Sequence, residues 1–88
     1  MSFVADRLIL FGATGDLSKR MLLPSLCALD ADELLDPKLE IVGTARSDLD
    51  DKGFRNFARE ALEKFLPPER RGSVATFLNR LSYQPLDA

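Results

Sequence analysis

The 88-residue chain contains no histidine, and this absence excludes the usual form of several functional sites. Histidine is the commonest general base in enzymes and the commonest protein ligand of zinc. The single cysteine, Cys27, has no partner for an internal disulfide and cannot build a cysteine-rich metal site. We therefore predict no metal centre in this chain and assign no catalytic residue to it.

Long apolar runs and an excess of positive charge are also lacking. The longest apolar run has four residues, whereas a membrane-spanning helix needs about 20. The N-terminus lacks the basic and then apolar segments of a signal peptide, which favours a cytoplasmic protein. Because 12 basic residues are scattered among 14 acidic ones, with a formal net charge of -2, we expect no nucleic-acid partner.

The apolar pattern of the first half of the chain predicts strand, helix, strand. A short apolar run that ends at a glycine turn predicts a buried parallel strand over 7–11, and 39–45 predicts a second. Between them, 16–30 is predicted to be a helix with Leu22, Leu26 and Leu29 on one face. Pro24 cannot donate to the carbonyl four residues earlier, so we expect a kink or a regular helix that begins only near Pro24.

The second half predicts two helices and a third strand. Apolar residues recur every three or four positions from Phe54 to Phe65, the clearest amphipathic pattern in the chain. Prolines end that helix, and Pro68 is placed to begin another, followed by an extended segment over 82–86. The residues of this second helix predicted to face inward are Val74, Phe77, Leu78 and Leu81.

This order of elements predicts an α/β fold, a partial Rossmann-like doubly wound parallel sheet of about three strands with flanking helices. We interpret residues 1–88 as the N-terminal half of a dinucleotide-binding domain, with the catalytic domain absent. Half of such a sheet leaves one edge and part of a face uncovered, so self-association through the exposed edge is an alternative that the sequence leaves open.

The segment Gly12-Ala13-Thr14-Gly15-Asp16-Leu17-Ser18-Lys19-Arg20 connects the first strand to the first helix, as a phosphate-binding turn does. Small residues let the backbone bend sharply and approach a pyrophosphate, while the free amides of the helix start face the anion. We predict that the cofactor is contacted in this turn by Gly12, Thr14, Gly15, Asp16, Leu17, Ser18 and Lys19.

The match to the three-glycine fingerprint is incomplete, because Leu17 stands where the third glycine would fall. Close packing of the helix would then depend on Leu17 and Ser18, and an ordinary strand-to-helix turn remains the alternative. The Thr14 hydroxyl would contact either a phosphate or the local backbone. Asp16 suits the positive end of the helix dipole, with its amide facing the ligand.

The end of the second strand, Thr44-Ala45-Arg46-Ser47, favours NADP over NAD. NAD-binding folds place an acidic residue on the ribose hydroxyls here, whereas this chain has none before Asp48. Arg46 could hold a 2′-phosphate through its planar guanidinium, and Ser47 adds a short donor. The alternative is that Arg46 is an ordinary surface arginine.

Together with Leu23-Pro24-Ser25-Leu26 and Ile41-Val42-Gly43, these two motifs resemble the N-terminus of glucose-6-phosphate dehydrogenases. The resemblance implies that the glycine turn binds the cofactor pyrophosphate through Gly12, Thr14, Gly15 and Leu17. It also implies that Arg46 holds the 2′-phosphate of NADP. The intact enzyme would then oxidise glucose 6-phosphate to 6-phosphogluconolactone by hydride transfer to NADP, in the oxidative pentose phosphate pathway.

The chain departs from that family in two respects. Met21 stands where the family often has a lysine that helps to hold phosphate groups. Family members are several times longer, and the resemblance implies that their catalytic histidine, its partner aspartate and the sugar-phosphate pocket lie beyond this chain. We therefore expect this chain to be inactive by itself.

Two other functions remain as alternatives. The first is a stand-alone nucleotide-binding or regulatory module. The second is an epimerase-like or short-chain-reductase domain, which shares the Gly-Ala-Thr-Gly opening. Such domains usually keep a glycine near Ser18 and need a later tyrosine and lysine, whereas Tyr83 is the only tyrosine and no lysine follows it.

Overall fold

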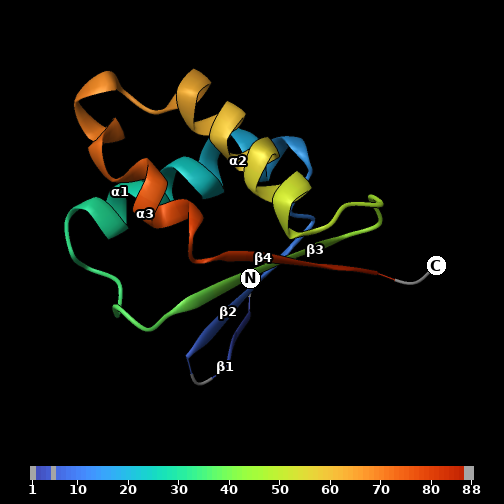
Figure 1. Ribbon diagram of the computed structural model, residues 1–88. Helices are drawn as coiled ribbons and strands as arrows, with labels where there is room; N and C mark the ends of the chain where they lie inside the picture. Colours follow the sequence, from blue (N-terminus) through green and yellow to red (C-terminus); the bar gives the residue numbers. More distant parts are fainter. Residues whose placement is uncertain (1, 5, 87–88) are drawn as a thin grey trace.

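The computed structural model, which describes residues 2–4 and 6–86, is an α/β structure of two layers (Figure 1). One layer is a four-stranded sheet in which the strands follow the order β1-β2-β3-β4. The strands are β1 (Ser2–Val4), β2 (Arg7–Phe11), β3 (Glu40–Ala45) and β4 (Leu81–Pro85). The other layer holds the π-helical turn η1 (Ser18–Leu22), α1 (Leu23–Ala31), α2 (Asp51–Phe65), the 3-10 helix η2 (Pro68–Ser73) and α3 (Val74–Leu78).

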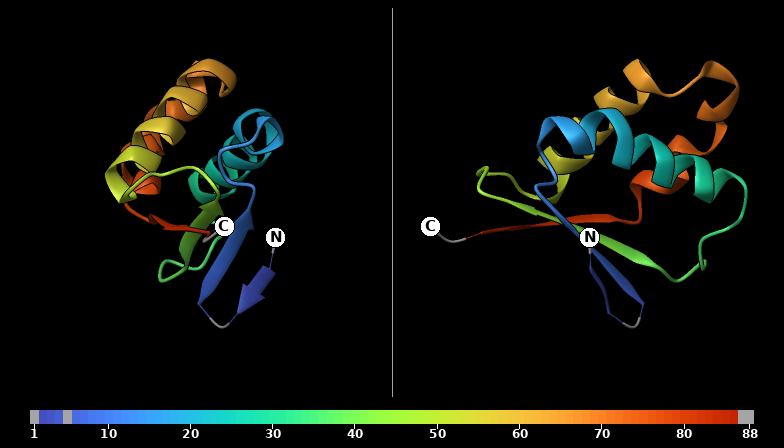
Figure 2. Two further views of the ribbon diagram at one scale, coloured as in Figure 1. Left: turned by 90° about the vertical axis from the view of Figure 1, so that its right-hand side faces the viewer. Right: turned by 180° about the vertical axis from the view of Figure 1, so that it is seen from behind.

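The three strands predicted from the sequence are parallel, which confirms the predicted fold class. β2 pairs with β3 through Leu8 and Ile41, and β3 pairs with β4 through Ile41 and Leu81. Each successive strand is added on the same side of the preceding one, and crossovers between parallel strands are right-handed. All helices therefore lie on one face of the sheet, as Figure 2 shows.

The opposite face of the sheet carries no helix among the described residues. Ile9 and Val42 occupy paired positions there and are half-buried, and the Phe11 side chain at the end of β2 is 56% exposed. In a complete doubly wound sheet both faces are covered by helices, so this face is of the kind that a second layer of helices covers.

The structure adds a strand that the sequence did not predict. This strand, β1, pairs antiparallel with β2 and covers its edge. In a complete doubly wound sheet the position beside the first parallel strand belongs to the fourth. β1 therefore lies where that strand would be. The outer edge of β4 is the parallel edge without a partner strand among the described residues.

The core lies between the sheet and the helices, and Gly43 in the middle of β3 controls how closely they approach. Phe54 at the start of α2 is fully buried against the sheet. A Cβ atom on Gly43 would lie 2.5 Å from Cζ of Phe54 and 2.9 Å from the Cβ of Ala13. Glycine is therefore required for α2 and the turn after β2 to pack together over the end of β3.

The first helix begins as Pro24 predicts, although its buried face is different. A π-helical turn precedes α1, the regular helix starts at Leu23, and Pro24 lies in its first turn, where no N–H is needed. Leu23, Leu26 and Cys27 are the residues that face the core. The prediction for Leu29 was wrong, since this side chain is 39% exposed, because the wider π turn rotates the face that follows it.

Two boundaries in the second half also differ from the prediction. α2 starts at Asp51 because the Asp50 side chain caps it, accepting a 2.7 Å bond from the amide of Gly53. The helix expected from Pro68 is a 3-10 helix up to Ser73, and only α3 is α-helical. Leu81 is fully buried, but it belongs to β4 rather than to that helix.

Candidate functional site

The glycine turn lies between the carboxyl end of β2 and the helical segment that begins at Asp16. Gly12 has a φ of +64°, which side-chain-bearing residues rarely adopt, and a Cβ placed on it would meet no atom within 4 Å. A Cβ on Gly15 would lie 3.1 Å from the carbonyl oxygen of Gly12. Gly12 is therefore needed for this turn, a side chain at Gly15 would crowd its backbone, and the space beside Gly12 is open to a ligand.

The helix that follows the turn directs free amides toward the same end of the sheet. Its first intrahelical bond is donated by the amide of Lys19 to the carbonyl of Gly15, at 3.1 Å. The amides of Asp16, Leu17 and Ser18 precede that bond, so they belong to the unpaired donors of a helix start. Unpaired amides at a helix start carry partial positive charge, and phosphates bind to helices at this end.

The structure brings the two predicted site segments together. The hydroxyls of Thr14 and Ser47 are hydrogen-bonded at 2.9 Å, across 33 positions of sequence. The amide of Ala13 also donates to the carbonyl of Thr44, at 3.1 Å. A pair of hydroxyls uses only one of its two protons internally, so the other remains available to an acceptor such as a phosphate oxygen.

The charged side chains of the site differ in whether they are neutralised. Arg20 pairs with Asp16 at 3.2 Å, in an exposed helical i, i+4 arrangement. Lys19 is half-buried and Arg46 is exposed, and neither forms an ion pair with a residue that the structure describes. Lys19, in the helical turn after the glycine turn, and Arg46, directly after β3, are thus left to attract an anion.

Leu17 and Ser18 contribute differently to the packing of the helix. Ser18 is 1% exposed, and its Oγ has no hydrogen-bond partner among the described residues, so it packs as a small residue against the core. Leu17 is 61% exposed and does not pack inward, which corrects the expectation for this residue. Only backbone groups of Ser18 can therefore face a ligand.

The sequence reasoning missed the contribution of Tyr83 to this region. Its buried hydroxyl donates to the carbonyl oxygens of Ala45, at 3.0 Å, and Ser47, at 2.8 Å. Tyr83 is paired with Gly43 across the two strands, so its position beside the end of β3 depends on strand register. No local pattern in the sequence could have placed it there.

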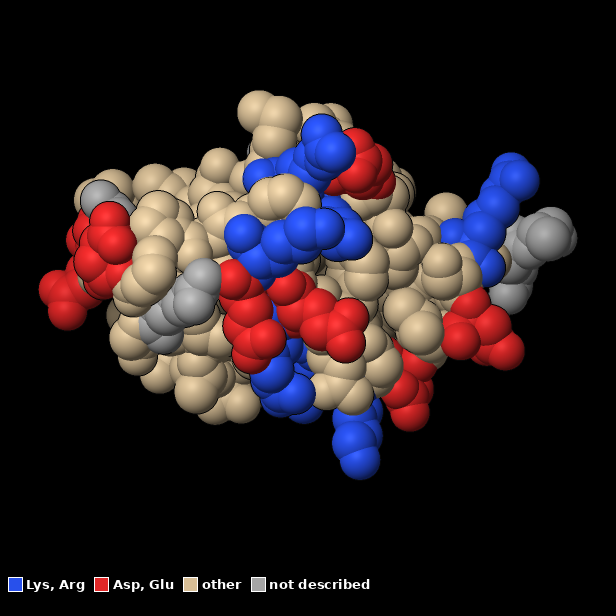
Figure 3. All heavy atoms as spheres, turned by 90° about the horizontal axis from the view of Figure 1, so that it is seen from above, with Lys and Arg blue, Asp and Glu red and all other residues tan. Residues whose placement is uncertain are grey.

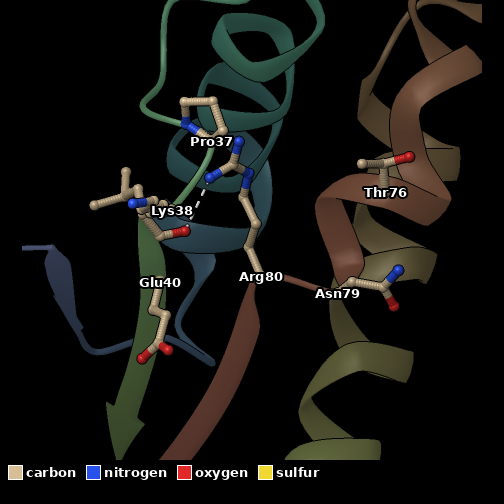
Figure 4. A pocket seen from close by; sticks show the side chains of 7 residues that line it. Pro37, Lys38, Glu40, Thr76, Asn79 and Arg80 are labelled. Carbon is tan, nitrogen blue, oxygen red and sulfur yellow. Dashed lines mark hydrogen bonds between the residues drawn. The ribbon is translucent and has the colours of Figure 1, made fainter.

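A second cluster of polar groups lies at the opposite end of the sheet, beside a cavity of about 300 Å³ (Figure 4). Arg80 extends there from the start of β4 toward the segment before β3, where Nη1 donates to the carbonyls of Asp36 and Leu39. Its Nη2 lies 2.8 Å from Oδ1 of Asp30, and both side chains are largely buried. Arg80 joins three segments of the chain through four hydrogen bonds, so we interpret this cluster as structural.

The surface of the helical layer shows no single dominant charge in the view of Figure 3, where basic and acidic side chains of the described residues alternate. None of the helices in the described part of the chain is both long and apolar enough to cross a membrane. The described residues likewise contain no group of three or more cysteine or acidic side chains that could hold a metal ion.

Comparison with known proteins identifies the relatives of this chain. The family model described as "Glucose-6-phosphate dehydrogenase, NAD binding domain" matches residues 9–88. A glucose-6-phosphate 1-dehydrogenase of Zymomonas mobilis is 52% identical over 99% of this chain, which covers 18% of that relative. The corresponding enzyme of Mycolicibacterium smegmatis is 41% identical over 90% of this chain, which covers 16% of its length.

Solved structures agree with these relatives. A glucose-6-phosphate dehydrogenase in complex with its substrate glucose-6-phosphate superposes with a TM-score of 0.80 at 32% identity, covering 99% of this chain and 18% of the other. The enzyme of Mycobacterium avium gives a TM-score of 0.77 at 30% identity, covering 98% of this chain and 18% of the other. The chain thus spans less than a fifth of the length of these proteins. It belongs to the glucose-6-phosphate dehydrogenase family, of which it represents the N-terminal NAD(P)-binding region.

Proposed function

We propose that this chain forms the part of a dinucleotide site that holds the pyrophosphate and the adenosine 2′-phosphate of NADP. The observation that carries this proposal is the direct Thr14–Ser47 hydrogen bond, which joins the glycine turn to the segment containing Arg46. The open space at Gly12 supports it, and so do the two cations, Lys19 and Arg46, that have no ion-pair partner among the described residues.

Each predicted site residue has a role in this proposal. The amides of Asp16, Leu17 and Ser18 would face the pyrophosphate at the helix start, next to Gly12 and Gly15. Lys19 would add a full positive charge. The Asp16 carboxylate is already paired with Arg20, so its role is to hold the helix start rather than to bind the ligand.

The 2′-phosphate is assigned to Arg46 and Ser47. We assign Thr14 to it as well, in place of the pyrophosphate contact implied by the family resemblance, because its hydroxyl bonds to Ser47. A guanidinium binds phosphate through two parallel hydrogen bonds, and Arg46 is exposed next to Ser47. The spare proton of the Thr14–Ser47 pair would complete the contact.

For the intact enzyme we propose oxidation of glucose 6-phosphate to its lactone, with residues 1–88 as the N-terminal half of the dinucleotide-binding domain. NADP supplies the hydride acceptor, while this chain binds and orients its adenosine side. With no histidine available as a general base, the 88-residue chain should not turn over sugar phosphates by itself. We also propose a cytoplasmic location.

The experiment is calorimetric titration of the folded chain with NADP and with NAD. Wild-type chain should bind NADP more tightly. Arg46→Ala should lose about 1.5 to 3 kcal/mol of NADP binding while NAD binding stays unchanged, because only NADP carries the 2′-phosphate. Arg59→Ala is the matched control, since Arg59 is an exposed arginine on α2 that bonds to Asn56. Equal losses for both nucleotides would contradict the role of Arg46.

We further propose that copies of this chain can associate through the outer edge of β4. A strand with unpaired backbone donors and acceptors is a template for another strand. Sedimentation equilibrium over a range of concentrations tests this proposal, and a concentration-independent monomer mass would contradict it.

A further inference from the structure

Tyr83 lies outside the predicted cofactor contacts, yet its hydroxyl connects directly to both neighbours of Arg46. The hydroxyl carries one proton, which lies between the carbonyl oxygens of Ala45, at 3.0 Å, and Ser47, at 2.8 Å. These carbonyls belong to the residues immediately before and after Arg46. A single donor therefore restrains the backbone on both sides of the residue to which we assign the 2′-phosphate.

The ring of Tyr83 is itself held firmly, so the hydroxyl has a defined position. The side chain is 7% exposed, and its ring lies 5.4 Å from the ring of Phe54 between centroids. Its backbone amide donates to Oδ1 of Asp51, at 2.7 Å. Contacts with the start of α2 therefore hold the tyrosine in place independently of its contacts with residues 45–47.

The restraint extends from Tyr83 to the glycine turn. Ser47 accepts from Tyr83 through its carbonyl and bonds to Thr14 through its hydroxyl. Tyr83, Ser47 and Thr14 therefore form a continuous series of contacts from the core to the turn.

We propose that Tyr83 is a positioning residue that orients Arg46 toward the 2′-phosphate, so that its hydroxyl contributes to the preference for NADP over NAD. This inference rests on the proposed function. Tyr83 touches no ligand in this arrangement and acts only through the backbone of residues 45–47.

Tyr83→Phe isolates the hydroxyl, because it keeps the ring and its packing against Phe54. The variant should fold, since each carbonyl keeps a second donor: the amide of Leu86 bonds to Ala45 at 2.8 Å, and the amide of Leu49 bonds to Ser47 at 3.1 Å. Ser82→Ala is the matched control. Ser82 pairs with Val42, on the face that carries no helix. The control therefore removes a hydroxyl from the same strand without affecting residues 45–47.

The experiment combines titration with NADP and NAD with amide hydrogen exchange in the nucleotide-free chain. For Tyr83→Phe, NADP affinity should fall about three- to tenfold, the range of one lost hydrogen bond, while NAD affinity changes less than twofold. Exchange at the amides of Leu49 and Leu86 should become faster. Ser82→Ala should change neither measurement.

The outcomes separate the inference from the proposed function. Equal losses for both nucleotides would show a merely structural tyrosine and overturn the inference, as would an unchanged NADP affinity. If wild-type chain binds neither nucleotide, the proposed function and the NADP preference fail together. In that case the exchange rates still test whether the Tyr83 hydroxyl restrains residues 45–47. Unchanged rates at Leu49 and Leu86 in Tyr83→Phe would show that it does not.

Discussion

Gly43→Ala should destabilise the chain by a steric effect whose size follows from the packing over β3. The added Cβ would lie 2.5 Å and 2.6 Å from two ring carbons of Phe54, whereas carbon atoms normally approach no closer than about 3.5 Å. Phe54 cannot move aside freely, because it is fully buried and its ring packs near those of both Phe57 and Tyr83. Overpacking of this kind costs about 1 to 3 kcal/mol.

The assay is urea unfolding followed by circular dichroism, with Gly72→Ala as the matched control. A Cβ on Gly72 would meet no atom within 4 Å, so that substitution tests the general effect of adding a methyl group to the unfolded chain. We expect Gly43→Ala to be less stable than Gly72→Ala by about 1 to 3 kcal/mol.

A double-mutant cycle identifies the contact that causes this loss. In a Phe54→Leu background, the cost of Gly43→Ala should decrease, because the ring carbons that the new methyl group meets are gone. Equal stability of Gly43→Ala and Gly72→Ala would refute the steric argument. An undiminished cost in the Phe54→Leu background would instead point to Ala13, the other atom group near this position.

Three further predictions concern the contacts around the two ends of the sheet. Arg80→Ala should lower the free energy of unfolding by about 3 to 5 kcal/mol in a urea titration, because it leaves the Asp30 carboxylate buried and unpaired; a loss below about 1 kcal/mol would indicate an ordinary surface ion pair. Thr14→Val and Ser47→Ala should show a coupling of about 0.5 to 1.5 kcal/mol in a double-mutant cycle of unfolding free energies, and additive effects would argue against their hydrogen bond. Burial raises the pKa of the Cys27 thiol, and the nearby Asp30 carboxylate raises it further, so a thiol reagent at pH 8 should modify the native chain far more slowly than the unfolded one. Since the unfolded thiol then ionises first, stability should decline only as pH rises above about 8.5, and a decline already present at pH 7 would contradict this assignment.

The features predicted correctly from the sequence are those that local chemistry determines. The apolar run before the glycine turn predicts β2 over 7–11, the same bounds as in the structure. Pro24 predicts the start of the regular helix, because a missing N–H acts within one turn of the chain. The order of these elements is sufficient for the fold class, since right-handed crossovers leave few arrangements of three parallel strands.

The features missed depend on contacts between distant parts of the chain. Leu29 was assigned to the buried face because regular helical spacing does not anticipate the π turn before α1. β1 is three residues long, which is too short for an alternating apolar pattern to predict a strand. The Thr14–Ser47 bond and the position of Tyr83 follow from strand register, which is set only when the whole sheet forms.

The placement of all helices on one face gives this chain a single interior. Ile9 and Val42 lie on the other face and are half-buried, so they gain less from the folding of this chain than the core residues and should tolerate polar replacement better. In a longer protein whose second layer covers that face, the same two positions would become core positions, and identical substitutions would be severe. The mutational tolerance of these two residues therefore depends on how much of the protein surrounds them rather than on their chemistry.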